Sequence, residues 1–310
     1  MFIIDIEHEM KNTKTRLKNT KRLIASMKVR PGRRVSLADY KTGWTGHITD
    51  KHEAAALLQK GIDRLAAQQE RLYAEDSYAL LVIFQAMDAA GKDSTIKHVM
   101  RGVNPQGCQV FSFKAPSAEE RDHDYLWRAM KALPERGRIG IHNRSYYEEV
   151  LVARVHPAVL ASQQMPEACK PGDIWTRRFH HINQFERYLV ENGIIVLKFY
   201  LNVSRKEQKK RLLERIERRE KNWKLSLSDV QLRSFGKDYR RAYEDVLSQT
   251  STRVAPWYVI PADHKWFTRL AVAAVIVDTL ERLDLHFPAM TKARRRELAE
   301  ARRLLMAEDE

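Results

Sequence analysis

The sequence predicts an α/β fold in which helices cover a mostly parallel sheet. Apolar strand-like runs alternate with helical segments, and parallel strands joined this way need helical crossovers. One run reads as a strand, a turn of small residues and the start of a helix: LLVIFQAMDAAGKDSTIKHVM at 80–100. A later strand ends in polar residues at 143–144. Because ligands of such sheets bind beyond the carboxyl ends of the strands, both segments are candidate sites.

The elements follow from apolar patterning and from turn and cap signals. A helix is expected at 51–76, where apolar residues recur at helical spacing, and Ser117 is a typical cap for a helix at 119–133. Strands are expected at 80–85, 108–113, 138–142, 194–201 and 257–260. The other helices are expected at 94–102, 145–155, 175–191, 204–220, 228–247 and 264–283.

The chain divides by composition. We expect a basic arm with little apolar patterning at 1–27, a helical extension at 28–76, a core at 77–290 with a lid at about 203–235, and a charged tail at 291–310. Hydrophobic residues make up 44% and charged residues 31%, which is typical of a globular protein. No apolar run approaches the roughly 20 residues that cross a bilayer, and two cysteines make no disulfide framework. We therefore expect a cytoplasmic protein that is not bound to a membrane.

The net charge of +15 is unevenly distributed. Residues 11–34 hold ten Lys and Arg with no Asp or Glu, and residues 205–224 hold ten Lys and Arg with four Glu. Such surfaces concentrate anions, among them nucleotides, nucleic acid and polyphosphate. A basic helix that is merely solvated is the alternative interpretation.

The turn at 86–95 has the residues of a phosphate-binding loop. Its backbone N–H groups and the helix N-terminus favour an anion, and Lys92 can reach terminal phosphoryl oxygens. The common pattern GxxxxGK[ST] is altered, because Ala86 replaces the first glycine and Asp93 replaces Ser/Thr. The alternative is a chance Gly-Lys turn. The remaining candidate phosphate ligands are Ala89, Ala90, Gly91, Ser94 and Thr95.

Asp88 is unusual inside such a loop, because a carboxylate repels phosphate. It is explained if Mg²⁺ lies between them, since hard cations bind carboxylate and phosphate oxygens together. The segment IGIHNRSYYEE offers a second group, in which Asn143 can hydrogen-bond and the Arg144 fork can bind phosphate. Glu148 is a second candidate metal ligand. An N-cap beside a surface arginine is the competing interpretation.

The basic helix at 204–226 predicts a lid over the loop. Lys221 and Lys224, beside Trp223, are the candidate lid contacts, and Arg178 on the helix at 175–191 is expected to face the channel.

Three stretches then carry a resemblance to a known family: QAMDAAGKDSTIKHVMRGVNPQGCQVFSFKAPS, GRIGIHNRSYYEEVLVARVHP, and FERYLVENGIIVLKFYLNVSRKEQKKRLLERI followed by KNWKLS. Together they resemble the family-2 polyphosphate kinases, and most closely the branch that phosphorylates nucleoside monophosphates as well as diphosphates. The similarity runs from about residue 28 to about residue 285.

The resemblance implies a P-loop kinase-like three-layer sandwich with a five-stranded parallel sheet and a helical lid. It implies transfer of the terminal phosphoryl group of polyphosphate to AMP or ADP, giving ADP or ATP, with Mg²⁺ or Mn²⁺. Lys92 would hold phosphates, Asp88 would act at the metal and the acceptor phosphate, and Arg144 would bind phosphate. Asn143 replaces the aspartate of much of the family, so a second aspartate metal ligand is not expected and the metal role falls to Asp88. We also expect a homo-oligomer.

Two other functions remain open on sequence alone. An ATP-dependent nucleoside monophosphate kinase could use the same loop and lid. A nucleic-acid-binding P-loop protein would explain the basic segments, although no interleaved aromatic–basic pattern or helix-turn-helix signature supports it.

Overall fold

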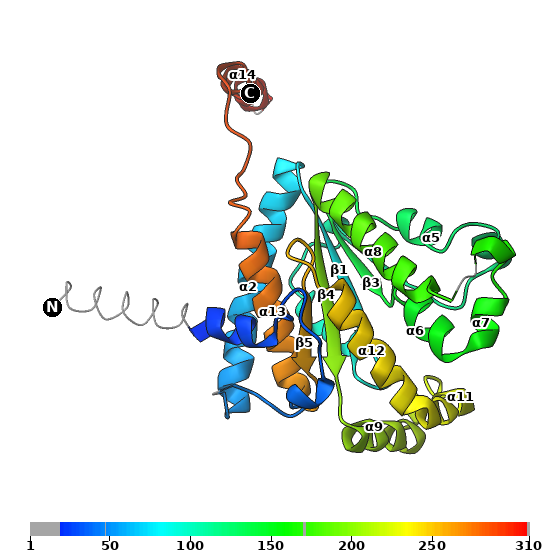
Figure 1. Cartoon of the computed structure of the whole chain (residues 1–310). Helices are drawn as coiled ribbons and strands as arrows, with labels where there is room; N and C mark the ends of the chain where they lie inside the picture. The colour runs from blue at the N-terminus through cyan, green and yellow to red at the C-terminus, as the bar shows by residue number, and fades with distance from the viewer. Residues whose placement is uncertain (1–18, 47, 170–171, 309–310) are drawn as a thin grey trace.

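The structure is a computed structural model that describes residues 19–46, 48–169 and 172–308. Its centre is a parallel sheet of five strands in the order β2-β3-β1-β4-β5, which confirms the predicted α/β class and strand number (Figure 1). The strands are β1 (Ala79–Ala86), β2 (Cys108–Ser112), β3 (Ile139–Asn143), β4 (Ile194–Asn202) and β5 (Trp257–Pro261).

Strand β1 lies in the middle of the sheet, and all eight of its residues are buried. A continuous apolar run of this kind suits a strand that is covered on both faces. Its partner register pairs Phe84 with Asn143 of β3 and Ala86 with Leu201 of β4. The carboxyl ends of the three central strands therefore meet at one edge of the sheet, where the phosphate loop begins.

Helices cover both faces of the sheet and complete three layers. On one side lie α2 (Lys51–Glu75) and α13 (Lys265–Glu281), and on the other α6 (Glu148–Val155), α8 (Ile174–Glu191) and α12 (Gly236–Thr250) (Figure 1). Helix α3 (Lys92–Val99) packs against α13. Because side chains alternate along a strand, Leu80 and Val82 of β1 join the core under α2 and α13, whereas Leu81 joins the core under α8 and α12.

The segment before α2 belongs to the first of these cores. Residues 19–27 are helical, and Ile24 and Met27 are 4% and 1% exposed. Lys28 then forms an antiparallel bridge with Tyr258, and the N–H of Val29 donates to the carbonyl of Trp257 at 2.9 Å. Part of the predicted basic arm is thus packed against the folded core, while residues 1–18 of that arm lie outside the described residues.

The Ile24→Ala substitution tests this packing. Removing a buried isoleucine side chain is expected to lower the free energy of unfolding by about 2–5 kcal/mol, because a cavity replaces core contacts. Denaturant unfolding followed by circular dichroism measures the change. Arg22→Ala, on the exposed side of the same helix, is the control. Equal unfolding midpoints for the two variants would contradict the packing.

Four expected helices differ in the structure. The helix predicted at 119–133 is two short helices, α4 (Ala118–Arg121) and α5 (Trp127–Met130), because the chain turns where Asp124 accepts from the N–H of Leu126 at 2.9 Å. The helix predicted from 145 begins at 148, after a turn in which the Ser145 hydroxyl accepts from the N–H of Tyr147.

The predicted lid helices are also shorter than expected. The run at 204–220 breaks at Arg218, whose backbone is extended, into α9 (Arg205–Glu217) and α10 (Arg219–Asn222). The run at 228–247 is α11 (Leu227–Gln231), a 3₁₀ turn at Leu232–Phe235, and then α12. The sequence did not predict α7 (Pro157–Ala161). Other 3₁₀ turns lie at Leu37–Asp39, Pro105–Gly107 and Glu167–Cys169.

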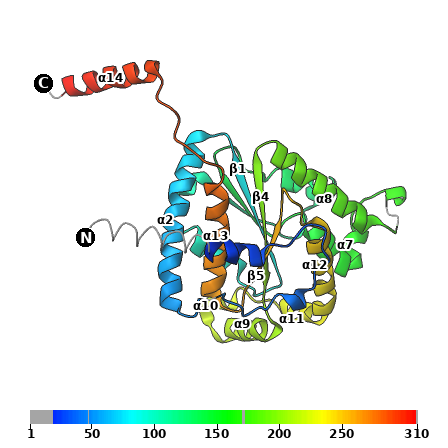
Figure 2. The same ribbon diagram turned by 60° about the vertical axis from the view of Figure 1, so that its left-hand side comes forward.

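Helix α14 (Lys292–Ala307) projects away from the three layers and has no buried residue (Figures 1 and 2). Within the described ranges, none of the helices combines the length and apolar character that crossing a membrane requires.

Candidate active site

The phosphate loop connects β1 to α3 at the carboxyl edge of the sheet. Its backbone is held in the left-handed region at two places, with φ of +59° at Ala89 and +104° at Gly91. Glycine adopts this conformation without strain, so Gly91 suits the position. Among the residues that the structure describes, no side chain caps the N-terminus of α3, and the first N–H groups of this helix are oriented for an anion.

A cleft of about 930 Å³ opens above this loop. Its walls come from the loop at 88–94, the end of β2 and the residues after it at 112–115, the turn at 143–144 and the lid. Eight lysine and arginine side chains line it against five carboxylates, so the cleft favours a polyanion. The cations are Lys92, Lys114, Arg144, Arg211, Arg215, Lys221, Lys224 and Lys265.

Lys92 lies at the floor of the cleft. Its ammonium is 3.4 Å from the carbonyl oxygen of Ala86, to which it donates. Burial lowers the pKa of Lys92 and nearby Arg144 lowers it further, whereas the carboxylates of Asp88 and Glu148 oppose this shift. An anion bound in the cleft would favour the charged form of this side chain.

Asp88, Arg144 and Glu148 form a charged group beside Lys92. The Arg144 guanidinium lies 3.2 Å from the Asp88 carboxylate and 3.6 Å from the Glu148 carboxylate. Burial raises the pKa of Glu148, and the charges of Arg144 and Lys92 oppose that shift. The structure therefore brings these four predicted residues together.

Arg144 lies in a turn that has an unusual backbone conformation. Its φ is +65°, in the left-handed region, and its N–H donates to the carbonyl of Phe84 at the end of β1 at 3.0 Å. A side chain with a Cβ adopts this conformation at a cost, so neighbouring contacts must maintain it.

Asp93 and Asn143 link the loop to the lid. The Asn143 amide donates to the Asp93 carboxylate at 2.9 Å, and the Lys224 ammonium lies 3.6 Å from the other carboxylate oxygen. Asn143 therefore contacts Asp93 directly. Asp93, Asn143 and Lys224 all line the cleft, which brings three of the predicted residues together.

The other lid candidates also border the cleft. Lys221 lies 3.6 Å from Glu214, and Trp223 is 78% exposed beneath the Lys224 ammonium. Ser94 lines the cleft as predicted, and its hydroxyl accepts from Arg269 at 2.9 Å. Thr95 is 3% exposed and does not line the cleft, and its N–H donates to the carbonyl of Gly91 at 2.9 Å at the start of α3.

Arg178 is not in the cleft, contrary to the sequence prediction. It is 3% exposed, and its guanidinium donates to the carbonyl of Glu149 at 2.7 Å and to the Gln163 side chain at 2.5 Å. The face of α8 that carries Arg178 packs toward α6, which explains why this arginine joins the interior between helices.

Two residues of α9 hold the phosphate loop, and sequence reasoning missed both. The Gln208 amide donates to the carbonyl of Asp88 at 3.0 Å. Arg211 donates to the carbonyls of Ala89 and Ala90 at 3.2 and 2.7 Å. Arg211 is 4% exposed, although it belongs to a helix that reads as solvated. The available signal was spacing, because Gln208 and Arg211 share a helix face with the buried Leu212.

A smaller cavity of about 140 Å³ lies on the other side of Arg144. Apolar and aromatic side chains, including Leu151, Tyr239 and Tyr243, line about half of it, and charged or polar side chains line the rest. Asp88 and Arg144 line both this cavity and the larger cleft. Asp229 of the lid lines both spaces as well, so they meet at the Asp88–Arg144 ion pair and at Asp229.

The described residues contain no group of three or more His, Cys, Asp or Glu side chains placed to hold a metal ion. Asp88 and Glu148 offer two carboxylates on either side of Arg144. Mg²⁺ characteristically takes one or two carboxylates and completes its ligands with phosphate oxygens and water, so this donor set fits it.

Comparisons with known proteins agree with the geometry. A family model described as polyphosphate kinase 2 matches residues 48–288. An ADP-polyphosphate phosphotransferase of Rhodopseudomonas palustris is 48% identical over 280 residues, which cover 90% of this chain and 97% of that protein. An AMP/ADP-polyphosphate phosphotransferase of Meiothermus ruber is 44% identical over 236 residues, covering 76% of this chain and 83% of that protein.

The crystal structure of polyphosphate kinase 2 from Arthrobacter aurescens TC1 is similar in fold. It superposes with a TM-score of 0.79 at 40% sequence identity, over 88% of this chain and 95% of that one.

Proposed function

The chain belongs to the polyphosphate kinase 2 family, and from this premise we propose how its cleft transfers a phosphoryl group. It is a phosphotransferase that phosphorylates nucleotides with polyphosphate as the phosphoryl donor. We infer that the transferred group lies at Asp88 and Arg144. The observation that carries this inference is that these two residues line both the basic cleft and the smaller cavity.

Polyphosphate would lie in the basic cleft, along the lid cations Lys221 and Lys224 towards Lys92. Its length and charge suit a long surface on which cations outnumber carboxylates. AMP or ADP would enter through the smaller cavity, where Tyr239 and Tyr243 offer apolar surface for the nucleoside. Its terminal phosphate would then meet the end of the polyphosphate chain at Arg144.

The reaction is an in-line displacement without a phospho-enzyme. An oxygen of the acceptor phosphate attacks the terminal phosphorus of polyphosphate, the bridging P–O bond breaks, and the shortened chain keeps the bond electrons. This nucleophile is anionic near neutral pH, so a strong general base is not needed. The main barrier is repulsion between two polyanions, and Lys92, Arg144 and the lid cations lower it by neutralising phosphate charge.

Asp88 and Glu148 would hold Mg²⁺ or Mn²⁺, which would supply further neutralisation of the phosphate oxygens. Before substrates bind, the positive charges of Arg144 and Lys92 balance the negative charges of the two carboxylates.

The direct test supplies AMP or ADP with polyphosphate and Mg²⁺ and omits ATP. We expect formation of ADP from AMP and of ATP from ADP, with polyphosphate consumed. An ATP-dependent nucleoside monophosphate kinase would give no product in this mixture. A nucleic-acid-binding protein would instead show steeply salt-dependent binding of DNA or RNA without phosphoryl transfer.

Arg211→Met tests whether α9 holds the loop. Losing the contacts to the Ala89 and Ala90 carbonyls is expected to lower kcat/KM by about 10- to 100-fold, because the loop N–H groups lose their alignment. Lys210→Met on the same helix is the control, since Lys210 is exposed and does not line the cleft. Similar kcat/KM values for the two variants would show that the loop keeps its shape without Arg211.

The predicted homo-oligomer and the cytoplasmic location stay predictions. Light scattering coupled to size-exclusion chromatography, compared with the chain mass of 36.2 kDa, measures the first.

A further inference from the structure

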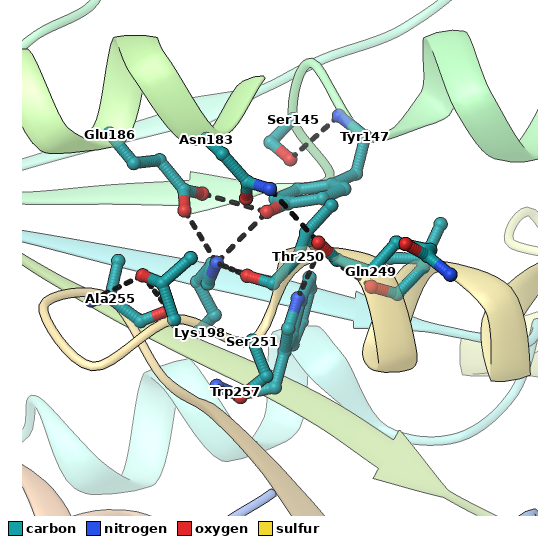
Figure 3. Close-up of polar contacts among 12 residues, drawn as sticks. Ser145, Tyr147, Asn183, Glu186, Lys198, Gln249, Thr250, Ser251, Ala255 and Trp257 are labelled. Carbon is teal, nitrogen blue, oxygen red and sulfur yellow. Dashed lines mark hydrogen bonds and ion pairs between the residues drawn. The ribbon is translucent and has the colours of Figure 1, made fainter. Parts of the chain in front are cut away.

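A fully buried polar cluster lies behind the active site. It joins the Lys198 ammonium of β4 to the Glu186 carboxylate of α8 at 2.5 Å (Figure 3). Both side chains are 0% exposed. Lys198 also donates to the Tyr147 hydroxyl at 3.0 Å and to the carbonyl of Thr250, at the end of α12, at 2.7 Å. All three N–H groups of the ammonium therefore have acceptors.

Two tyrosines bind the same carboxylate oxygen of Glu186. The hydroxyls of Tyr146 and Tyr147 donate to its Oε1 atom at 2.9 and 2.7 Å. Both rings are 0% exposed, and burial raises the pKa of each phenol well above its usual range, so both remain donors. The cluster thus ties the start of α6 to α8, β4 and α12.

Burying this ion pair costs desolvation free energy that an apolar core would not lose. Removing Lys198 and Glu186 from water opposes folding, and an apolar pair of similar volume often stabilises a protein as well or better. Burial accordingly lowers the pKa of Lys198, while Glu186 opposes the shift. An ion pair in this place therefore calls for a role besides stability.

The tyrosines that the cluster holds directly follow the active-site turn. Arg144 has the left-handed φ of +65°, and Ser145, which is 0% exposed, accepts from both the Gln85 amide and the N–H of Tyr147 at 3.2 Å. The N–H of Arg144 is bound to the end of β1. The turn is therefore fixed on its β1 side by hydrogen bonds and on its α6 side by the two tyrosines.

We propose that Lys198 and Glu186 are positioning residues that act through the hydroxyls of Tyr146 and Tyr147 to hold Arg144 against the transferred phosphate. The proposal rests on the role of Arg144 in the proposed function. None of the four residues lines the cleft or the smaller cavity, so each acts only through the turn. A loosened turn would let the Arg144 side chain leave Asp88, and the geometry for transfer would be lost.

The test removes the tyrosine tethers and keeps the ion pair. Lys198→Met or Glu186→Gln alone leaves a buried partner uncompensated and strongly destabilises the fold, whereas Tyr146→Phe with Tyr147→Phe keeps both rings packed. We expect this double variant to fold and to lose at least about 10-fold in kcat, with KM for AMP changed less than about 2-fold. Tyr258→Phe, a buried tyrosine on the opposite face of the sheet, is the control and should keep its kcat.

Combining the tyrosine changes with Arg144→Ala distinguishes a role in positioning Arg144 from a general role in packing. In an Arg144→Ala background, the two phenylalanine changes are expected to reduce kcat by less than about 2-fold, because the residue that they act on is gone. An equal reduction in both backgrounds would overturn the proposal, and so would a double variant with normal kcat beside an impaired Arg144→Ala enzyme. Normal activity of Arg144→Ala itself would refute the role of Arg144 in the proposed function and this inference with it.

Discussion

Replacing Lys92 by Met is expected to lower kcat by about 10²- to 10³-fold, equivalent to roughly 3–4 kcal/mol of lost transition-state stabilisation. Lys92 lies on the floor of the basic cleft at the start of α3, where its ammonium can reach a terminal phosphoryl group. Methionine keeps most of the side-chain volume and removes the charge. Because the site works by neutralising two polyanions, the loss falls mainly on the chemical step.

Steady-state formation of ADP from AMP and polyphosphate measures this effect. Lys97→Met is the matched control, because Lys97 is an exposed residue of the same helix and does not line the cleft. The control should retain its kcat, and both variants should unfold at similar temperatures. A Lys92→Met enzyme as active as the control would remove this lysine from the mechanism.

Asp88→Asn is expected to lower kcat by about 10²-fold or more. The substitution keeps the shape of the side chain and removes the charge that faces Arg144 at 3.2 Å. It also removes one of the two carboxylates proposed to hold Mg²⁺. Since Asn143 at the neighbouring strand end brings no negative charge, no aspartate stands at that position to compensate.

The dependence of the rate on Mg²⁺ concentration distinguishes the metal role of Asp88 from its ion pair. If Asp88 is a ligand, saturation of the Asp88→Asn enzyme should require more Mg²⁺ than saturation of the unchanged enzyme. Asp63→Asn, at an exposed position on α2, is the control. A lower kcat with an unchanged Mg²⁺ requirement would restrict Asp88 to holding Arg144.

Sequence reasoning reached the parts of the site that are contiguous in the chain. The loop after β1 and the turn after β3 each carry their functional residues within a few positions, and parallel strands necessarily bring those two ends together. The central strand could be predicted because all of its residues except Gln85 are apolar, and the structure extends it by only one residue at each end.

The contacts of helix residues were harder to predict, because the same residue type is buried on one face of a helix and exposed on another. Arg178 was expected to face the channel and Arg211 lies on a helix that reads as basic, yet both are buried, one between helices and one under the phosphate loop. Which cation turns inward depends on packing between elements that are distant in sequence. Lys198 had a signal of its own, a single charge within the apolar run IIVLKFYLN, but its partner Glu186 could not be read from that run.

The bridge between Lys28 and Tyr258 has a consequence for how the chain folds. The Ser251 hydroxyl donates to the carbonyl of Val29, a contact that spans 222 residues, and β5 is the last strand to leave the ribosome. The backbone pairing of residues 28–29 must therefore wait until β5 has been made. Until then β4 presents an open edge to other chains. Completion of this sheet is a late, long-range event, and until it occurs the exposed strand edge can pair with other chains.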